Sequence, residues 1–156
     1  MPVVEYCSPD WAGSAATNLN QLNSVISFFA AIVRNRNPSL IFTKTGQILD
    51  HLKLLPFNIR RQVSDLRFLH QTLNGRFRSE ELMNLFSLHV PARRTRLFST
   101  LHVPRLRLSV SQRSFSYRIP SLYNALTLND KIDFTKSQNL FLSHVSKVLS
   151  DQIECT

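Results

Sequence analysis

The sequence is poor in the residues that build nucleotide-binding loops and cross-linked scaffolds. Its three glycines, Gly13, Gly46 and Gly75, are too far apart for a phosphate-cradling loop or a dinucleotide fingerprint. Its two cysteines, Cys7 and Cys155, lie near opposite ends and lack the paired spacing of a zinc ribbon or knuckle. A disulfide between them is the less favoured alternative to two free thiols. These shortages exclude folds that depend on a P-loop, a Rossmann turn or structural zinc.

Long apolar runs are also missing. The longest near-apolar run extends from Val25 to Val33 and is interrupted by Ser27, so it is too short to span a bilayer. The run lies too far from Met1, and lacks a basic leader, to act as a signal peptide. We therefore expect an intracellular protein, in the nucleus or the cytoplasm, with no membrane partner.

Recognisable catalytic and metal-binding patterns are absent from the sequence. It contains no HExxH or GxSxG motif, no metal-spaced Cys/His cluster and no adjacent aspartates for two magnesium ions. His89 and His102 could approach each other across a ribbon, although two ordinary half-buried histidines are preferred to a metal site. We therefore assign no catalytic residue, no metal ligand and no cofactor, and predict that this chain is not an enzyme.

What the sequence does have is arginine. The chain has 156 residues and a net charge of +9, and its length fits one compact domain or a domain with a tail. The stretch from Arg60 to Arg118 holds twelve arginines, three acidic residues and no lysine, so it carries the whole surplus. Guanidinium groups bind phosphate bidentately and stack on bases. Contact with nucleic acid is therefore preferred to the alternative, a solvated basic face without a partner.

Hydrophobic periodicity predicts several helices along the chain. Apolar residues at helical spacing predict helices over 17–34 and 58–73, with Thr17 as the N-terminal cap of the first and Gly75 as the C-terminal stop of the second. Weaker or shorter helices are expected at 47–54, after Ser79, at 121–126 and at 133–152.

The pattern changes after Ser87. Leu88-His89-Val90-Pro91 recurs thirteen residues later as Leu101-His102-Val103-Pro104, and arginines follow each copy. Proline disfavours helix here, and residues 105–110 alternate with period two, which is typical of extended chain. We predict extended segments that pair as a ribbon with arginines on one side; chance similarity of two extended stretches is the alternative. Phe115 and Tyr117 could stack on bases, but core packing is the preferred interpretation.

Five segments, in conserved order along the chain, carry a family resemblance. Residues 4–11 (VEYCSPDW) are similar to the LEYxSxxW segment that follows the palm in non-LTR retrotransposon reverse transcriptases of the jockey and CR1 type. Residues 54–75 (LLPFNIRRQVSDLRFLHQTLNG) resemble the LPxxxRRxxxDLxFLYKxLNG motif of that family, and this is the most specific match. Residues 91–96 (PARRTR), 113–126 (RSFSYRIPSLYNAL) and 133–142 (DFTKSQNLFL) resemble its PxRxTR, SFxxRxxxLWNxLP and SLxxFKxxL segments.

The resemblance implies a truncated fragment of a transposable element, namely the thumb and post-polymerase part of an RNA-directed DNA polymerase. The catalytic palm, with its Mg²⁺, would lie upstream of Met1. We then expect a mainly α fold, a thumb-like helical bundle with a short extended or β-ribbon segment around residues 88–118. Residues 1–86 would form the helical thumb-like region, and residues 87–156 the Arg-rich extended segment plus the C-terminal helix.

The function implied by the resemblance is nonspecific binding of RNA or an RNA–DNA hybrid, with a polymerase palm supplied in trans as a further candidate partner. A non-enzymatic interaction module, or an inactive remnant without selected function, is the alternative. The residues predicted to contact nucleic acid are all arginines: Arg60, Arg61, Arg93, Arg94, Arg96, Arg105, Arg107, Arg113 and Arg118.

Overall fold

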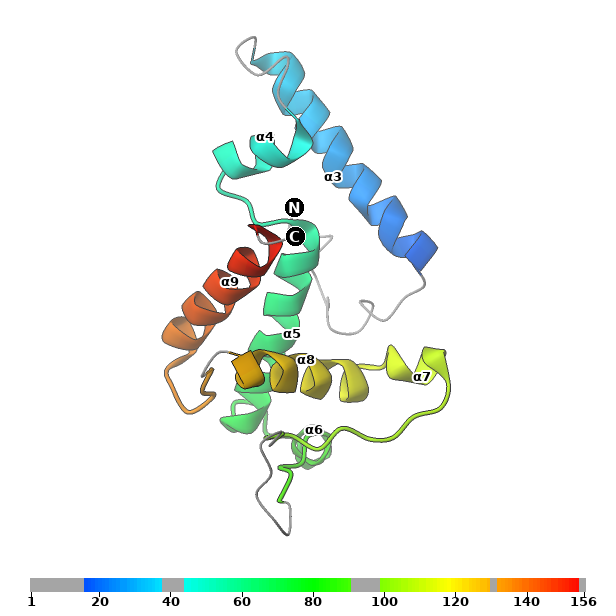
Figure 1. Ribbon diagram of the computed structural model, residues 1–156, viewed down its shortest axis with the longest axis vertical. Helices are drawn as coiled ribbons and strands as arrows, with labels where there is room; N and C mark the ends of the chain where they lie inside the picture. The colour runs from blue at the N-terminus through cyan, green and yellow to red at the C-terminus, as the bar shows by residue number, and fades with distance from the viewer. Residues whose placement is uncertain (1–15, 38–43, 91–98, 130–131, 155–156) are drawn as a thin grey trace.

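A computed structural model describes residues 16–37, 44–90, 99–129 and 132–154 of the chain. These residues form seven helices, labelled as in Figure 1: α3 (Ala16–Arg36), α4 (Thr45–His51), α5 (Phe57–Leu73), α6 (Glu80–Asn84), α7 (Ser109–Gln112), α8 (Phe115–Asn129) and α9 (Gln138–Glu154). The prediction of a mainly α fold with a helical bundle is therefore confirmed. No helix in this part of the chain is both long and apolar enough to cross a membrane.

The main core is built around α5. Figure 1 shows α5 in the middle of the molecule, with α9 beside it and α8 crossing it, and α5 makes its most extensive contacts with these two helices. Leu66 and Leu69 of α5 are completely buried against Tyr123 of α8 and Phe141 of α9, among others. Since apolar burial contributes about 25 cal/mol per Å², this three-helix contact is the main source of stability and fixes the direction of α8.

A smaller cluster joins α3 to α4. Ile26 of α3 is buried with Leu49 of α4 and Phe57 at the start of α5, and Leu22 and Leu54 pack against them. The predicted helix over 17–34 is present and is slightly longer. It begins at Ala16, so Thr17 lies inside the first turn and the prediction that Thr17 is the cap is wrong.

The C-terminal end of α5 follows the prediction for Gly75. Asn74 caps the helix, and Gly75 has a φ of +66°, in the left-handed region that glycine adopts without steric cost. The Gly75 amide donates to the Thr72 carbonyl at 3.1 Å, and the Arg76 amide donates to the Gln71 carbonyl at 2.9 Å. This pair of hydrogen bonds is the Schellman arrangement, which satisfies carbonyls that the helix end would leave without donors.

Two glycine substitutions are expected to change stability in opposite directions. Gly75→Ala should lower the free energy of unfolding by about 1 kcal/mol, because alanine is strained at positive φ although no heavy atom lies within 4 Å. Gly46→Ala, inside α4 and equally open, should raise it by about 0.5 kcal/mol, because glycine is a poor helix former. Denaturant midpoints at constant slope measure both changes. Shifts of the same sign would contradict the left-handed helix end at Gly75.

The two Leu-His-Val-Pro copies pair as an antiparallel bridge. Leu88 lies opposite Leu101, the His89 amide donates to the Thr100 carbonyl, and the His102 amide donates to the Ser87 carbonyl, both at 2.9 Å. Only the leucine of each copy takes part, because antiparallel pairing places His89 opposite Thr100 and His102 opposite Ser87. In the described residues the pairing is limited to this one bridge.

The extended segment ends earlier than predicted. Of the region around 88–118, the structure describes residues 88–90 and 99–118, and the last part is helical: α7 begins at Ser109, and α8 begins at Phe115 instead of near Ser121. The sequence predicted a short helix over 121–126 here, and proline inside a helix removes a backbone hydrogen bond. Pro120 nevertheless lies inside α8 and is buried. Burial of Ile119 and Tyr123 on the same helix offsets the lost bond.

Candidate nucleic-acid interface

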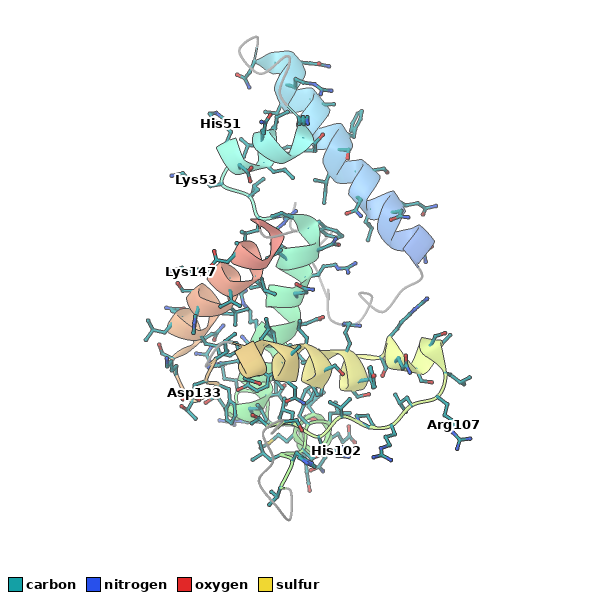
Figure 2. The ribbon with its side chains drawn as sticks, in the orientation of Figure 1. His51, Lys53, His102, Arg107, Asp133 and Lys147 are labelled. Carbon is teal, nitrogen blue, oxygen red and sulfur yellow. The ribbon has the colours of Figure 1, made fainter. Side chains whose placement is uncertain are left out.

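Three of the predicted arginines are displayed on one continuous piece of chain. Arg105 and Arg107 are exposed on the extended segment before α7, and Arg113 is exposed at the C-terminal cap of α7. Figure 2 shows Arg107 at the outer edge of the molecule, near α7. Residues 82–129 contain no aspartate or glutamate, so no acid from this part of the sequence neutralises these charges. These three exposed arginines, named here the arginine edge, therefore carry guanidinium groups suited to phosphate.

The extended segment that carries this edge is held at two points. At one end, the buried Asn124 side chain of α8 accepts from the Leu101 amide at 3.0 Å and donates to the Leu101 carbonyl at 2.8 Å. At the other end, the Gln112 side chain of α7 donates to the Leu106 carbonyl at 2.9 Å. Because both ends are hydrogen-bonded to helices, Arg105 and Arg107 are presented by a restrained backbone and not by a free loop.

Arg118 has a different role from the one predicted. Its Nε donates to Asp65 Oδ2 at 2.9 Å and its Nη2 donates to Asp65 Oδ1 at 3.1 Å, which joins α8 to α5 through a bidentate ion pair. Its Nη1 also donates to the Arg113 carbonyl at 2.7 Å, which holds the end of α7. The Arg118 side chain is 22% exposed and that of Asp65 only 3%. We therefore count Arg118 as a positioning residue and not as a phosphate contact.

Arg60 and Arg61 are half-buried at the first turn of α5. Their guanidinium carbons lie 5.8 Å and 5.5 Å from the centre of the Phe57 ring, a cation–π arrangement. Burial lowers the pKa of the Arg61 guanidinium; the nearby Asp65 opposes this shift, whereas Arg118 adds to it. The structure thus does not bring these two arginines into the exposed edge formed by Arg105, Arg107 and Arg113.

The remaining arginines lie either outside the described residues or outside the predicted contact set. Arg93, Arg94 and Arg96 lie outside the residues that the structure describes. The predicted contact set omitted three arginines that are exposed: Arg67 on α5, and Arg76 and Arg78 between α5 and α6. The exposure of Arg67 is predictable from the sequence, because this residue lies off the apolar stripe of its helix.

The two repeat histidines approach each other at the bridge. The His89 and His102 ring centres are 6.5 Å apart, with His89 partly exposed and His102 exposed, as the ribbon prediction anticipated. Within the described ranges, no group of three or more His, Cys, Asp or Glu side chains is placed to hold a metal ion. His102 lies three residues before Arg105 along the chain.

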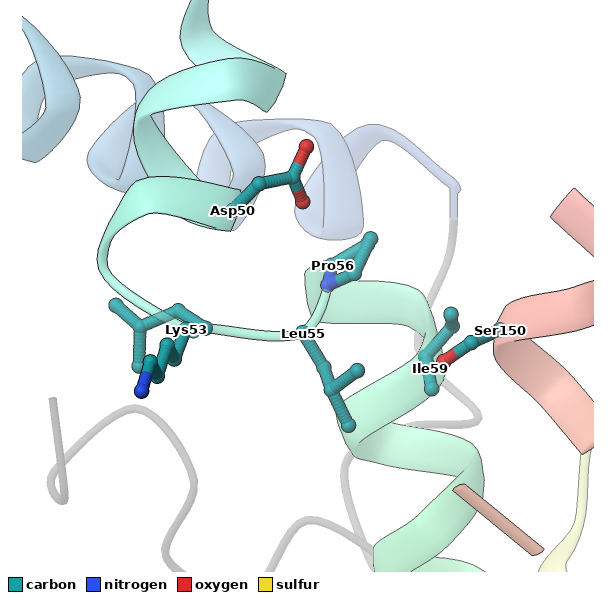
Figure 3. Close-up of a pocket in the computed structure, with 7 residues that line it drawn as sticks. Asp50, Lys53, Leu55, Pro56, Ile59 and Ser150 are labelled. Atoms are coloured by element: carbon teal, nitrogen blue, oxygen red, sulfur yellow. The ribbon is translucent and has the colours of Figure 1, made fainter. Parts of the chain in front are cut away.

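A pocket of about 360 Å³ lies on another part of the molecule, where the α4–α5 connection meets α9. Figure 3 shows its lining: Asp50, Lys53, Leu55, Pro56, Ile59 and Ser150 are labelled, and Asp50 and Lys53 point in different directions. The Ser150 hydroxyl already donates to the Ser146 carbonyl at 2.8 Å. Because its polar groups do not converge on one point, this pocket is a weaker candidate than the arginine edge.

Comparison with known proteins adds no assignment to this geometry. The chain matches no protein-family model, no curated protein and no solved structure.

Proposed function

We propose that the chain is the C-terminal, thumb-like part of a non-LTR retrotransposon reverse transcriptase, and that its residual function is nonspecific binding of RNA or an RNA–DNA hybrid. The observation that carries the binding proposal is the exposed edge of Arg105, Arg107 and Arg113 in an acid-free stretch of chain. Such an edge contacts phosphates, which are present in every sequence, and so gives affinity without base specificity. The protein would act inside the cell, in the nucleus or the cytoplasm.

Under this proposal the chain performs no polymerase chemistry of its own. The Mg²⁺ ions and catalytic carboxylates of the parent RNA-directed DNA polymerase would belong to its palm. Among the described residues, the buried carboxylate is that of Asp65, and it is already bound to Arg118. We expect a mixture of chain, template, primer and Mg²⁺ to give no primer extension.

Binding to different polyanions tests the proposal. Fluorescence anisotropy at low salt should detect binding to labelled single-stranded RNA and to an RNA–DNA hybrid, and weaker binding to polyglutamate, whose carboxylates fit guanidinium groups but whose backbone carries no phosphate or base. Equal affinity for polyglutamate and RNA would reduce the proposal to a general affinity for negative charge. Failure to bind RNA or hybrid would overturn it.

One observation favours the alternative, a non-enzymatic interaction module. Val25, Phe28 and Ile32 lie on one side of α3 at helical spacing and are 47%, 68% and 38% exposed. An apolar helix face of this kind is typical of a surface that meets a partner. Self-association that disappears in Phe28→Gln, together with an absence of RNA binding, would favour this alternative.

A further inference from the structure

A groove opens between the extended segment and the first turn of α8. Its volume is about 590 Å³, within the range of about 300–1,000 Å³ common for small-ligand sites. The residues that line it are Val103, Pro104, Arg105, Leu106, Arg107 and Tyr117. None of the arginines is paired with an acid in the described contacts, and the groove is open to solvent along the positive edge.

Hydrogen bonds attach the extended segment that lines the groove to two helices. Asn124 holds Leu101 at one end and Gln112 holds Leu106 at the other. Tyr117 and Asn124 are seven residues apart on α8, which places them two turns apart on the same face of the helix. The face of α8 that anchors the extended segment therefore also carries the Tyr117 ring, which is in place without a ligand.

The lining combines two kinds of chemistry. Tyr117, Pro104 and Leu106 offer aromatic and apolar surface, while the exposed Arg105 and Arg107 offer guanidinium groups at the same groove. Aromatic rings next to cationic groups are the combination with which proteins bind unpaired bases and the phosphates that join them. The bases of a duplex are already stacked on each other, so they cannot enter such a groove without unpairing.

We propose that this groove binds an unpaired nucleotide of a single-stranded nucleic acid, with its base stacked on Tyr117 and its flanking phosphates on Arg105 and Arg107. The inference rests on the proposed function and deepens it, because it names a single strand as the preferred ligand and gives Tyr117 a role beyond packing. The site would recognise any base, since every base has a π-face.

The test compares strands that carry bases with strands that lack them. Wild-type protein should bind a short single-stranded oligouridylate roughly tenfold more tightly than the abasic strand with the same phosphates. Tyr117→Leu should bind the two strands equally, and Tyr117→Phe should keep the preference, because the ring is retained. The second arm repeats the comparison with the deoxyribose form of the strand. A higher affinity for the base-bearing strand with either sugar supports the groove, and the sugar for which it is found shows whether the bound strand is RNA or DNA.

A matched control removes an aromatic ring of the same helix outside the groove. Phe115 packs against Phe68, with ring centres 6.3 Å apart, so Phe115→Leu should lower stability but leave the preference for bases unchanged. If Tyr117→Leu fails to fold, the wild-type and Tyr117→Phe measurements carry the test. Equal wild-type affinity for base-bearing and abasic strands would overturn the groove and leave the proposed function standing. Absence of binding to either strand, and to the hybrid, would overturn both.

Discussion

Replacing Arg105, Arg107 and Arg113 with glutamine is expected to weaken binding to single-stranded RNA by about two to three orders of magnitude at ~50 mM salt. Each phosphate contact on a single strand contributes about 0.7 to the slope of log affinity against log salt, so losing three should make the slope shallower by about 2. The physical reason is the release of counterions, which each guanidinium displaces from the strand. Anisotropy titrations at several salt concentrations measure both quantities.

The control for this triple variant removes the same charge from elsewhere. Arg36, Lys53 and Lys147 are exposed on other elements, and changing all three to glutamine lowers the net charge of +9 by the same amount. Figure 2 shows Lys53 and Lys147 well apart from Arg107. The control should therefore keep most of the salt slope. An equal loss in both triple variants would mean that net charge, and not the arginine edge, determines binding.

Asp65→Asn is expected to lower the free energy of unfolding by about 3 kcal/mol. The substitution keeps the side-chain shape but removes the negative charge that balances Arg118, and it leaves Arg61 and Arg118 close together without the acid that both of them face. Removing one partner of a buried pair is costly because the other charge remains desolvated. Asp151→Asn, at an exposed site, should change stability by less than about 0.5 kcal/mol.

A double-variant cycle separates the pair from the packing around it. Asp65→Asn combined with Arg118→Gln should cost less than the sum of the two single changes, since the double variant leaves no uncompensated charge in the pair. Strict additivity, measured by urea denaturation, would contradict the coupling between α5 and α8. Loss of the pair should also weaken RNA binding, because Arg118 holds the end of α7 through the Arg113 carbonyl.

The pair also makes stability depend on pH in a defined direction. Burial raises the pKa of Asp65 above its ordinary value of 3.8, while the Arg118 hydrogen bonds, the Arg118 charge and the Arg61 charge oppose the rise. Arg118→Gln removes the largest opposing contribution, so the folded-state pKa should rise further. A carboxyl whose pKa is higher in the folded state than in the unfolded state stabilises the fold at pH values below its unfolded-state pKa. This stabilisation is lost as the pH rises through the folded-state pKa. The deficit of Arg118→Gln relative to wild type should therefore grow from acid toward neutral pH.

The local features of this fold were readable from the sequence because they depend on near neighbours. The apolar stripe of α5 and the left-handed Gly75 follow from 3.6-residue periodicity and from the backbone freedom of glycine. The repeat indicated that His89 and His102 could approach each other, and their ring centres lie 6.5 Å apart beside the Leu88–Leu101 bridge. Alternation also predicted that Arg105 and Arg107 would share one exposed side.

The features that the sequence did not reveal depend on distant residues. Asp65 and Arg118 are 53 positions apart, and nothing in either local pattern distinguishes a paired arginine from an exposed one. The same holds for Arg60 and Arg61, whose half-burial depends on the packing around the start of α5. The length of α8 was underestimated because burial of Ile119 and Tyr123 overrides the local effect of Pro120. For Tyr117 the sequence favoured core packing over stacking on bases, and the structure places the partly buried residue in the lining of a groove.

The salt dependence of RNA binding by the unmodified chain measures whether the arginine edge contacts phosphates. If Arg105, Arg107 and Arg113 each contact a phosphate, the plot of log affinity against log salt for single-stranded RNA should have a slope of about −2 or steeper. Binding should be clear at low salt and weak at high salt. A slope near zero, or no detectable binding at the lowest salt concentration, would contradict the account.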